Sequence, residues 1–88
     1  MYKSKEMSRS VWSLDKKYLV MVHAKFRTVR GLTGQLIAKA VVHVYEGDPI
    51  VTGASSIFTG FSDLHSYDLL DELQNAERIG RDFIASIR

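Results

Sequence analysis

Two stretches of alternating side chains, 17–29 (KYLVMVHAKFRTV) and 35–45 (QLIAKAVVHVY), constrain the fold of this chain most strongly. Because successive side chains of a strand point to opposite faces, each stretch predicts a strand with one apolar face. We expect this face to be buried and the two strands to form an antiparallel hairpin. The apolar face holds Tyr18, Val20, Val22, Ala24 and Phe26 on the first strand, and Leu36, Ala38, Ala40, Val42 and Val44 on the second.

The opposite side of the hairpin, here called the mixed face, combines apolar and basic side chains. It holds Leu19, Met21, His23, Lys25 and Arg27 on the first strand, and Ile37, Lys39, Val41, His43 and Tyr45 on the second. Two registers keep the apolar faces together, and they place Lys39 opposite Lys25 or Arg27. Like charges directly opposite each other destabilise a sheet. Either an anionic group visits these side chains, or their long stems splay into water.

The remaining pattern predicts a third strand and a helix. A turn at 30–34 closes the hairpin, and a second turn at 46–49, with Gly47 and Pro49, leads to a strand at Ile50–Phe58. After a loop at 60–65, Ser66 is the expected N-cap of a helix from Tyr67 to Ile87. Its apolar stripe consists of Leu69, Leu70, Leu73, Ala76, Gly80, Phe83, Ile84 and Ile87. We therefore predict an α+β fold, a three-stranded antiparallel meander packed on one face by a single C-terminal α-helix.

The chain has 88 residues, of which 45% are hydrophobic, and this suffices for one core. We expect residues 1–10 to form a flexible basic N-terminal arm, and 11–88 to form a single βββα domain. Trp12 is expected to anchor the start of that domain in the core.

The composition also bears on the compartment. Without cysteine, neither disulfides nor thiolate metal ligands are available, and small secreted domains usually depend on such links. No apolar run approaches the roughly 18 residues of a membrane span, and the polar start has no signal-peptide core. We therefore expect a cytoplasmic protein that does not bind membranes.

Catalytic and metal-binding patterns are missing from the sequence. It contains no recognisable triad, paired-carboxylate site or nucleotide-binding loop, so we expect neither enzymatic activity nor a cofactor. His23 and His43, with Asp63 and His65 from the loop, raise the question of a metal site. Their spacing matches no known ligand pattern, and the neighbouring lysines would repel a cation. We therefore expect no bound metal.

The predicted layout resembles, in topology alone, two kinds of nucleic-acid-binding domain. These are the small arm-type DNA-binding domains of phage integrases, and the last three strands and helix of double-stranded-RNA-binding domains. The latter begin their helix with Lys-Lys-x-Ala-Lys, whereas this helix begins with Ser66, Tyr67, Asp68 and Leu69. No functional residue is therefore carried over from either family.

Two binding functions follow from the mixed face. In the first, the mixed face binds a protein partner, either another protein or a second copy of this chain. The interface residues are then Leu19, Met21, Ile37, Val41 and Tyr45. Desolvating apolar side chains favours this hypothesis. The small size suggests an accessory or host-modulating factor of a bacterium or phage.

In the alternative, the mixed face and the N-terminal arm bind nucleic acid through Lys25, Arg27, Arg30, Lys39, His23 and His43. The charge distribution is consistent with this alternative, and equally with head-to-tail self-association or with no function at all. Residues 1–45 hold nine lysines or arginines and two acidic residues, a net charge of +7, whereas residues 46–88 hold three arginines and eight acidic residues, a net charge of −5.

Overall fold

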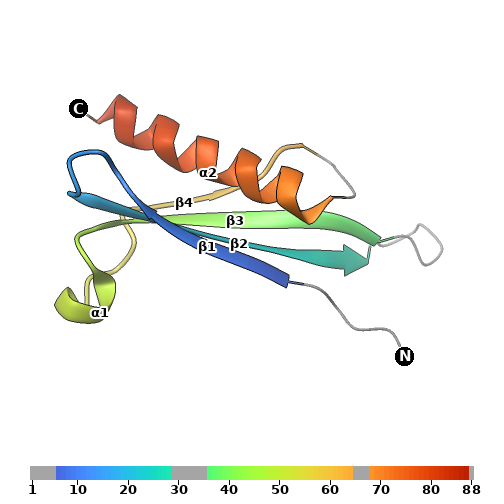
Figure 1. The fold of residues 1–88 in the computed structure, drawn as a ribbon, viewed down its shortest axis with the longest axis horizontal. Coiled ribbons are helices and arrows are strands. Elements are labelled where there is room, and N and C mark those ends of the chain that lie inside the picture. Colours follow the sequence, from blue (N-terminus) through green and yellow to red (C-terminus); the bar gives the residue numbers. More distant parts are fainter. Residues whose placement is uncertain (1–5, 29–35, 65–67, 88) are drawn as a thin grey trace.

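The computed structural model describes residues 6–28, 36–64 and 68–87, and the side chains of residues 27, 28, 36 and 37 lie outside the described part. One antiparallel sheet in the order β1-β2-β3-β4 packs against a C-terminal helix, which confirms the predicted α+β class. Figure 1 shows α2 lying across one face of the sheet and α1 on the opposite side, at one end. The elements are β1 (Glu6–Trp12), β2 (Tyr18–Thr28), β3 (Leu36–Glu46), α1 (Pro49–Thr52), β4 (Phe58–Phe61) and α2 (Leu69–Ser86).

The predicted central hairpin and its apolar face are confirmed. β2 and β3 pair in the register that places Lys25 opposite Lys39, one of the two registers that the sequence allowed. The same register aligns the apolar side chains of both strands on the face toward α2. Burying these side chains between sheet and helix is the main source of stability in a domain of this size. The fully enclosed strand residues are Val20, Val22, Ala24, Ala38, Ala40, Val42 and Val44.

A fourth strand, β1, occupies part of the segment predicted as a flexible arm. Glu6 to Trp12 pair with β2 in one continuous register, from Glu6 opposite Lys25 to Trp12 opposite Leu19. Trp12 is not the predicted core anchor, because it lies on the face away from α2 and is 42% exposed. β1 is held instead by its ladder with β2, by Val11 against the core, and by Arg9 on the helix side. Residues 1–5 lie outside the described part.

The third strand was predicted too early in the chain. Pro49 to Thr52 form the short helix α1, and the strand after it, β4, begins at Phe58. The Asp48 carboxylate accepts a hydrogen bond from the Ile50 N–H, and Pro49 occupies the first turn, where its missing N–H costs nothing. The sequence Asp48-Pro49 is therefore a helix start rather than only a turn. β4 pairs with β3 from Val41 opposite Phe61 to Val44 opposite Phe58.

The helix α2 begins two residues later than predicted. Its N-cap is Asp68, whose carboxylate accepts hydrogen bonds from the Leu70 and Asp71 N–H groups, while the predicted cap Ser66 lies outside the described residues. Leu69, Leu73 and Ile84 are buried as predicted. Leu70 and Ile87, also assigned to the stripe, are 41% and 45% exposed. No helix in the described ranges is long and apolar enough to cross a membrane.

A buried polar cluster ties α2 to the sheet. Glu72 is fully buried, and the Ser62 hydroxyl donates to its Oε1 at 2.6 Å. The same hydroxyl oxygen accepts from the Ala40 N–H at 3.0 Å, and the Ser62 N–H donates to the Ala40 carbonyl. A buried carboxylate is costly unless its oxygens are hydrogen-bonded, so Ser62 links the two structural layers at this point.

Candidate binding surface

The mixed face of the sheet is the side that α2 leaves open. The mixed face is wider than the predicted hairpin. By their pairing with β2 and β3, the edge strands β1 and β4 add side chains on both sides of it. The cross-strand rows run from Trp12 through Leu19 to Tyr45, and from His23 through Val41 to Phe61. The extended surface therefore gains Glu6, Ser8, Ser10 and Trp12 from β1, and Thr59 and Phe61 from β4.

The apolar residues predicted to form a protein interface are not equally accessible. Leu19 is only 8% exposed, because its cross-strand neighbours are the large rings of Trp12 and Tyr45. Met21 is 37% exposed, and Val41 and Tyr45 are half-buried. The Ile37 side chain lies outside the described part, although its backbone pairs with Arg27.

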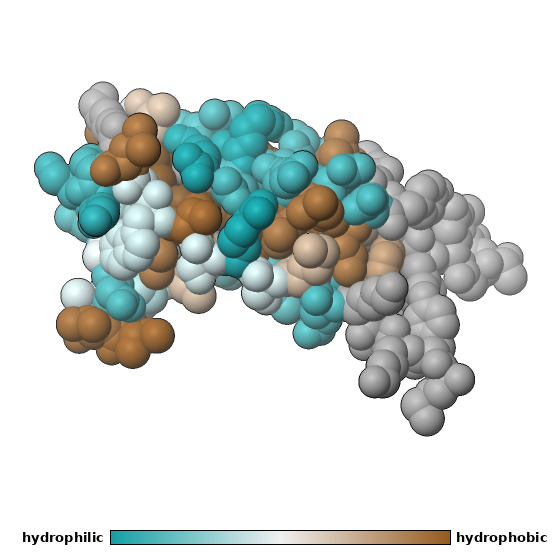
Figure 2. Space-filling model, in the orientation of Figure 1, coloured by the Kyte–Doolittle hydropathy of each residue, from teal (hydrophilic) through white to brown (hydrophobic). Residues whose placement is uncertain are grey.

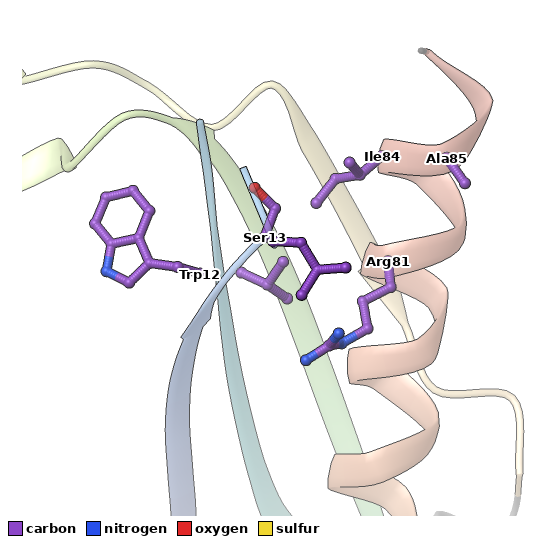
Figure 3. A pocket seen from close by; sticks show the side chains of 7 residues that line it. Trp12, Ser13, Arg81, Ile84 and Ala85 are labelled. Atoms are coloured by element: carbon purple, nitrogen blue, oxygen red, sulfur yellow. The ribbon is translucent and has the colours of Figure 1, made fainter. Parts of the chain in front are cut away.

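Two large aromatic side chains that the sequence did not assign to this surface lie on it. Phe61 is 67% exposed and Trp12 is 42% exposed. Figure 3 shows the Trp12 ring on the opposite side of β1 from Arg81 and Ile84, and therefore away from α2. The alternation of residues 57–61 indicates that Phe61 shares a face with Thr59. The predicted strand ended at Phe58, so Phe61 was not assigned to the sheet.

The predicted cationic residues lie at one end of the same surface. Lys25 and Lys39 face each other directly across β2 and β3, with Lys25 exposed and Lys39 half-buried. Glu6 is the residue opposite Lys25 on its other side. Arg27 continues β2 beyond this pair, but its side chain is not described, and Arg30 lies outside the described residues. The charge of the surface is therefore concentrated at the far end from Trp12.

Hydroxyl groups orient both histidines of the mixed face. The Ser8 hydroxyl lies 2.7 Å from His23 Nδ1, and the Thr59 hydroxyl lies 3.0 Å from His43 Nδ1. The His43 and Tyr45 rings are 6.3 Å apart between centroids. Within the described residues no three His, Cys, Asp or Glu side chains are grouped so as to hold a metal ion. The two imidazoles are instead held by hydroxyl groups of the edge strands β1 and β4.

The mixed face contains two shallow hollows. One, of about 350 Å³, has Ser8 and Ser10 along one side and Met21, His43 and Tyr45 along the other. The second, of about 160 Å³, lies between the Lys25–Lys39 pair and Phe61. His23 lines both hollows and separates them. Such open, ring-lined depressions suit flat groups laid against a sheet better than a substrate enclosed in a cleft.

Two other features lie outside the mixed face. A hollow of about 250 Å³ separates the β1–β2 turn from the end of α2, between Leu14, Ile84 and Arg81 (Figure 3). The short helix α1 exposes Ile50 and Val51, which are 91% and 81% exposed. In Figure 2 this apolar patch is the brown cluster at the lower left, where Figure 1 places α1.

Comparison of the chain with protein-family models, with curated proteins and with solved structures finds no match.

Proposed function

We propose that the protein binds single-stranded nucleic acid on the mixed face. The observation that carries this proposal is that exposed or partly exposed rings and a facing lysine pair share the open side of a four-stranded sheet, with one ring, Phe61, beside the lysines and the other two at the opposite end. The rings are Trp12, Tyr45 and Phe61, and the lysines are Lys25 and Lys39. Sheets that bind single strands combine these two elements, because bases stack on rings while cations attract the phosphates.

Charge supports an anionic ligand on this side of the molecule. Among the described side chains, the mixed face carries Lys25 and Lys39 against the single carboxylate of Glu6, whereas α2 carries four acidic residues and two arginines. A polyanion approaching the protein is therefore attracted to the sheet and repelled by the outer side of the helix.

The rings favour a single strand over a duplex. Bases within a duplex are stacked on one another and do not offer their faces to a protein, whereas unstacked bases do. The mixed face presents strands, with only the one-turn helix α1 at one end of that side of the sheet, and its hydroxyl-bearing side chains, Ser8, Ser10 and Thr59, are short. We therefore expect the protein to bind a single strand more tightly than the duplex of the same sequence.

A protein partner is the second candidate, and exposed apolar side chains favour it. Met21 and Phe61 on the mixed face, together with Ile50 and Val51 on α1, form apolar surface typical of an interface core. The burial of Leu19 weakens this hypothesis, because it removes one of the aliphatic side chains expected in the interface. The exposed large apolar side chains that remain on the mixed face are Trp12, Met21 and Phe61, of which two are aromatic.

The test is a fluorescence anisotropy titration with labelled single strands of about 16 nucleotides, the upper range for one small binding module. The same sequence is measured as a duplex, and both are measured from 50 to 200 mM salt as is usual for phosphate contacts. Phe61→Ala should weaken binding by about 5- to 100-fold, as expected for one stacked base. Leu70→Ala, which removes a similarly sized exposed apolar side chain from α2, is the matched control and should leave affinity unchanged.

The lysines make a separate prediction. Lys25→Ala and Lys39→Ala should each reduce the salt dependence of binding by about one unit of slope, whereas Lys17→Ala, in the β1–β2 turn, should not. Absence of binding at the lowest salt, or equal effects of Phe61→Ala and Leu70→Ala, would rule out the proposal.

The second candidate has its own measurement. If the mixed face binds a protein, a photo-crosslinking residue at position 61 on this face should form an adduct with the partner. The same residue at position 70, on α2, should form none. Met21→Glu should abolish that adduct while the circular dichroism spectrum stays that of the folded protein. An adduct that persists after Met21→Glu would exclude the mixed face as the interface.

A further inference from the structure

The outer edge of β1 leaves backbone hydrogen-bonding groups open to a partner strand. The Ser13 N–H donates to the Tyr18 carbonyl at 2.9 Å, which fixes the alternation of the ladder between β1 and β2. The odd-numbered residues of β1 therefore bond to β2, and the backbone groups of the even-numbered residues point away from it. Within the described ranges no backbone group pairs with these outward groups. They belong to Glu6, Ser8, Ser10 and Trp12.

This edge lacks several of the features by which proteins usually protect an exposed strand. Glu6–Trp12 contains no proline, glycine or lysine, and its register with β2 shows no bulge. Its one cation, Arg9, turns toward the helix side, where its Nε lies 3.0 Å from Glu77 Oε1. The other edge strand, β4, has four residues against the seven of β1.

We infer that β1 pairs antiparallel with β1 of a second copy, about a two-fold axis at Arg9. The strand is nearly symmetric in chemistry about this residue, because a serine stands on each side and an apolar residue beyond each serine. Antiparallel pairing about Arg9 places Ser8 opposite Ser10 of the second copy, and Met7 opposite Val11 of the second copy. A strand from a different protein would match this order of small and apolar side chains only by chance, whereas β1 of a second copy matches it by symmetry.

The side chains at this seam are compatible with close approach. Met7, 37% exposed, and Val11, already packed against the core, would cover each other on the helix side. The two Arg9 side chains meet near the axis, and each is already within ion-pair distance of its own Glu77. The small serines meet on the mixed face. A single strand pair is much smaller than a standard interface of about 1,600 Å², so the dimer should depend on protein concentration.

The symmetry determines how the two copies are arranged. A two-fold axis perpendicular to the sheet keeps both α2 helices on one side and joins the two mixed faces into one surface. The two four-stranded sheets then form one continuous sheet, in which each β1 becomes a central strand. This inference does not depend on what the mixed face binds, since it follows from the backbone of β1.

Sedimentation of the full chain over a concentration series tests the inference. Ser10→Pro removes an outward N–H and fills the edge with a ring, but leaves the bonds from β1 to β2 in place. The wild type and the control Ser10→Ala should sediment as dimers at high concentration, and Ser10→Pro as a folded monomer. A wild type that remains monomeric at millimolar concentration, or a folded Ser10→Pro that still dimerises, would refute the pairing.

A second measurement tests the pairing independently of whether Ser10→Pro folds. The chain contains no cysteine, so a single introduced cysteine can form a disulfide only with its copy in a second molecule. Arg9 of each copy should form a non-hydrogen-bonded pair with Cα atoms about 4.5 Å apart, within the range of about 4.4–6.8 Å for a disulfide. Arg9→Cys should therefore oxidise to a covalent dimer at least tenfold faster than Leu70→Cys on α2. Equal rates would overturn the inference, and faster linkage of Ser8→Cys than of Arg9→Cys would refute the axis at Arg9.

Discussion

Replacing Gly80 with alanine tests how closely α2 approaches the sheet. A β-carbon at this position would lie 2.8 Å from Val42 Cγ2, 3.1 Å from Val20 Cγ1 and 3.4 Å from Val44 Cγ2. The shortest of these distances is well below ordinary van der Waals contact. Rotation about χ1 is restricted for valine and these valines are buried, so the helix must move away from the strands.

Two opposing terms set the expected effect of Gly80→Ala. Alanine stabilises a helix interior by about 1 kcal/mol relative to glycine. Overpacking a well-packed core costs about 1–3 kcal/mol. With a value of about 2 kcal/mol for the second term, we expect the free energy of unfolding to fall by about 1 kcal/mol, a decrease in Tm of about 4–8 °C for a domain of this size.

Urea unfolding followed by circular dichroism measures this change, and a double-mutant cycle assigns its cause. Val42→Ala removes the nearest methyl groups, so it should cost less in the Gly80→Ala background than in the wild type, with a coupling energy of about 0.5–3 kcal/mol. A Gly80→Ala variant that is more stable than the wild type by about 1 kcal/mol would show that helix propensity alone acts there. An additive cycle would refute close contact with Val42.

Two further substitutions probe how α2 is attached and started. Ser62→Ala leaves the buried Glu72 carboxylate and the Ala40 N–H without this hydrogen-bond partner, so the free energy of unfolding should fall by about 1–3 kcal/mol. Ser55→Ala, which truncates an exposed serine, should change stability little, and equal losses would contradict the role of Ser62. Asp68→Ala should lower the free energy of unfolding by about 1 kcal/mol, because it removes the N-cap of α2. Asp68→Asn keeps a capping side chain and should therefore retain most of the wild-type stability. Thermal unfolding of the two variants measures this difference.

The parts of the fold that the sequence predicted are those where burial and periodicity agree. In β2 and β3 every second side chain is apolar, so slipping the register by one residue would expose the core, and the alternation alone identified the buried face. The stripe on α2 was recognisable for the same reason. Burial of Leu70 and Ile87 was overestimated, because Leu70 lies about 100° around the helix from the buried Leu69 and Ile87 follows the last helical residue.

The parts that were missed depend on contacts between distant residues. β1 has no apolar alternation of its own, since five of its residues in succession are exposed, and its structure follows from pairing with β2. Burial of Glu72 follows from Ser62, ten residues earlier and across a connecting segment. Phe61 entered the mixed face only once β4 was placed correctly. The predicted lysine and histidine positions on that face followed directly from alternation, and their role as a binding site stays a prediction.

The order of the strands has a consequence for synthesis on the ribosome. Each of β2, β3 and β4 pairs with the strand made immediately before it, so the sheet can assemble step by step as the chain emerges. The helix that covers the core is made after all four described strands, and until α2 emerges the valines of β2 and β3 have no covering layer. We therefore expect nascent chains stalled before Leu69 to be captured by chaperones that bind exposed apolar strands, and chains in which α2 has emerged to be released from them.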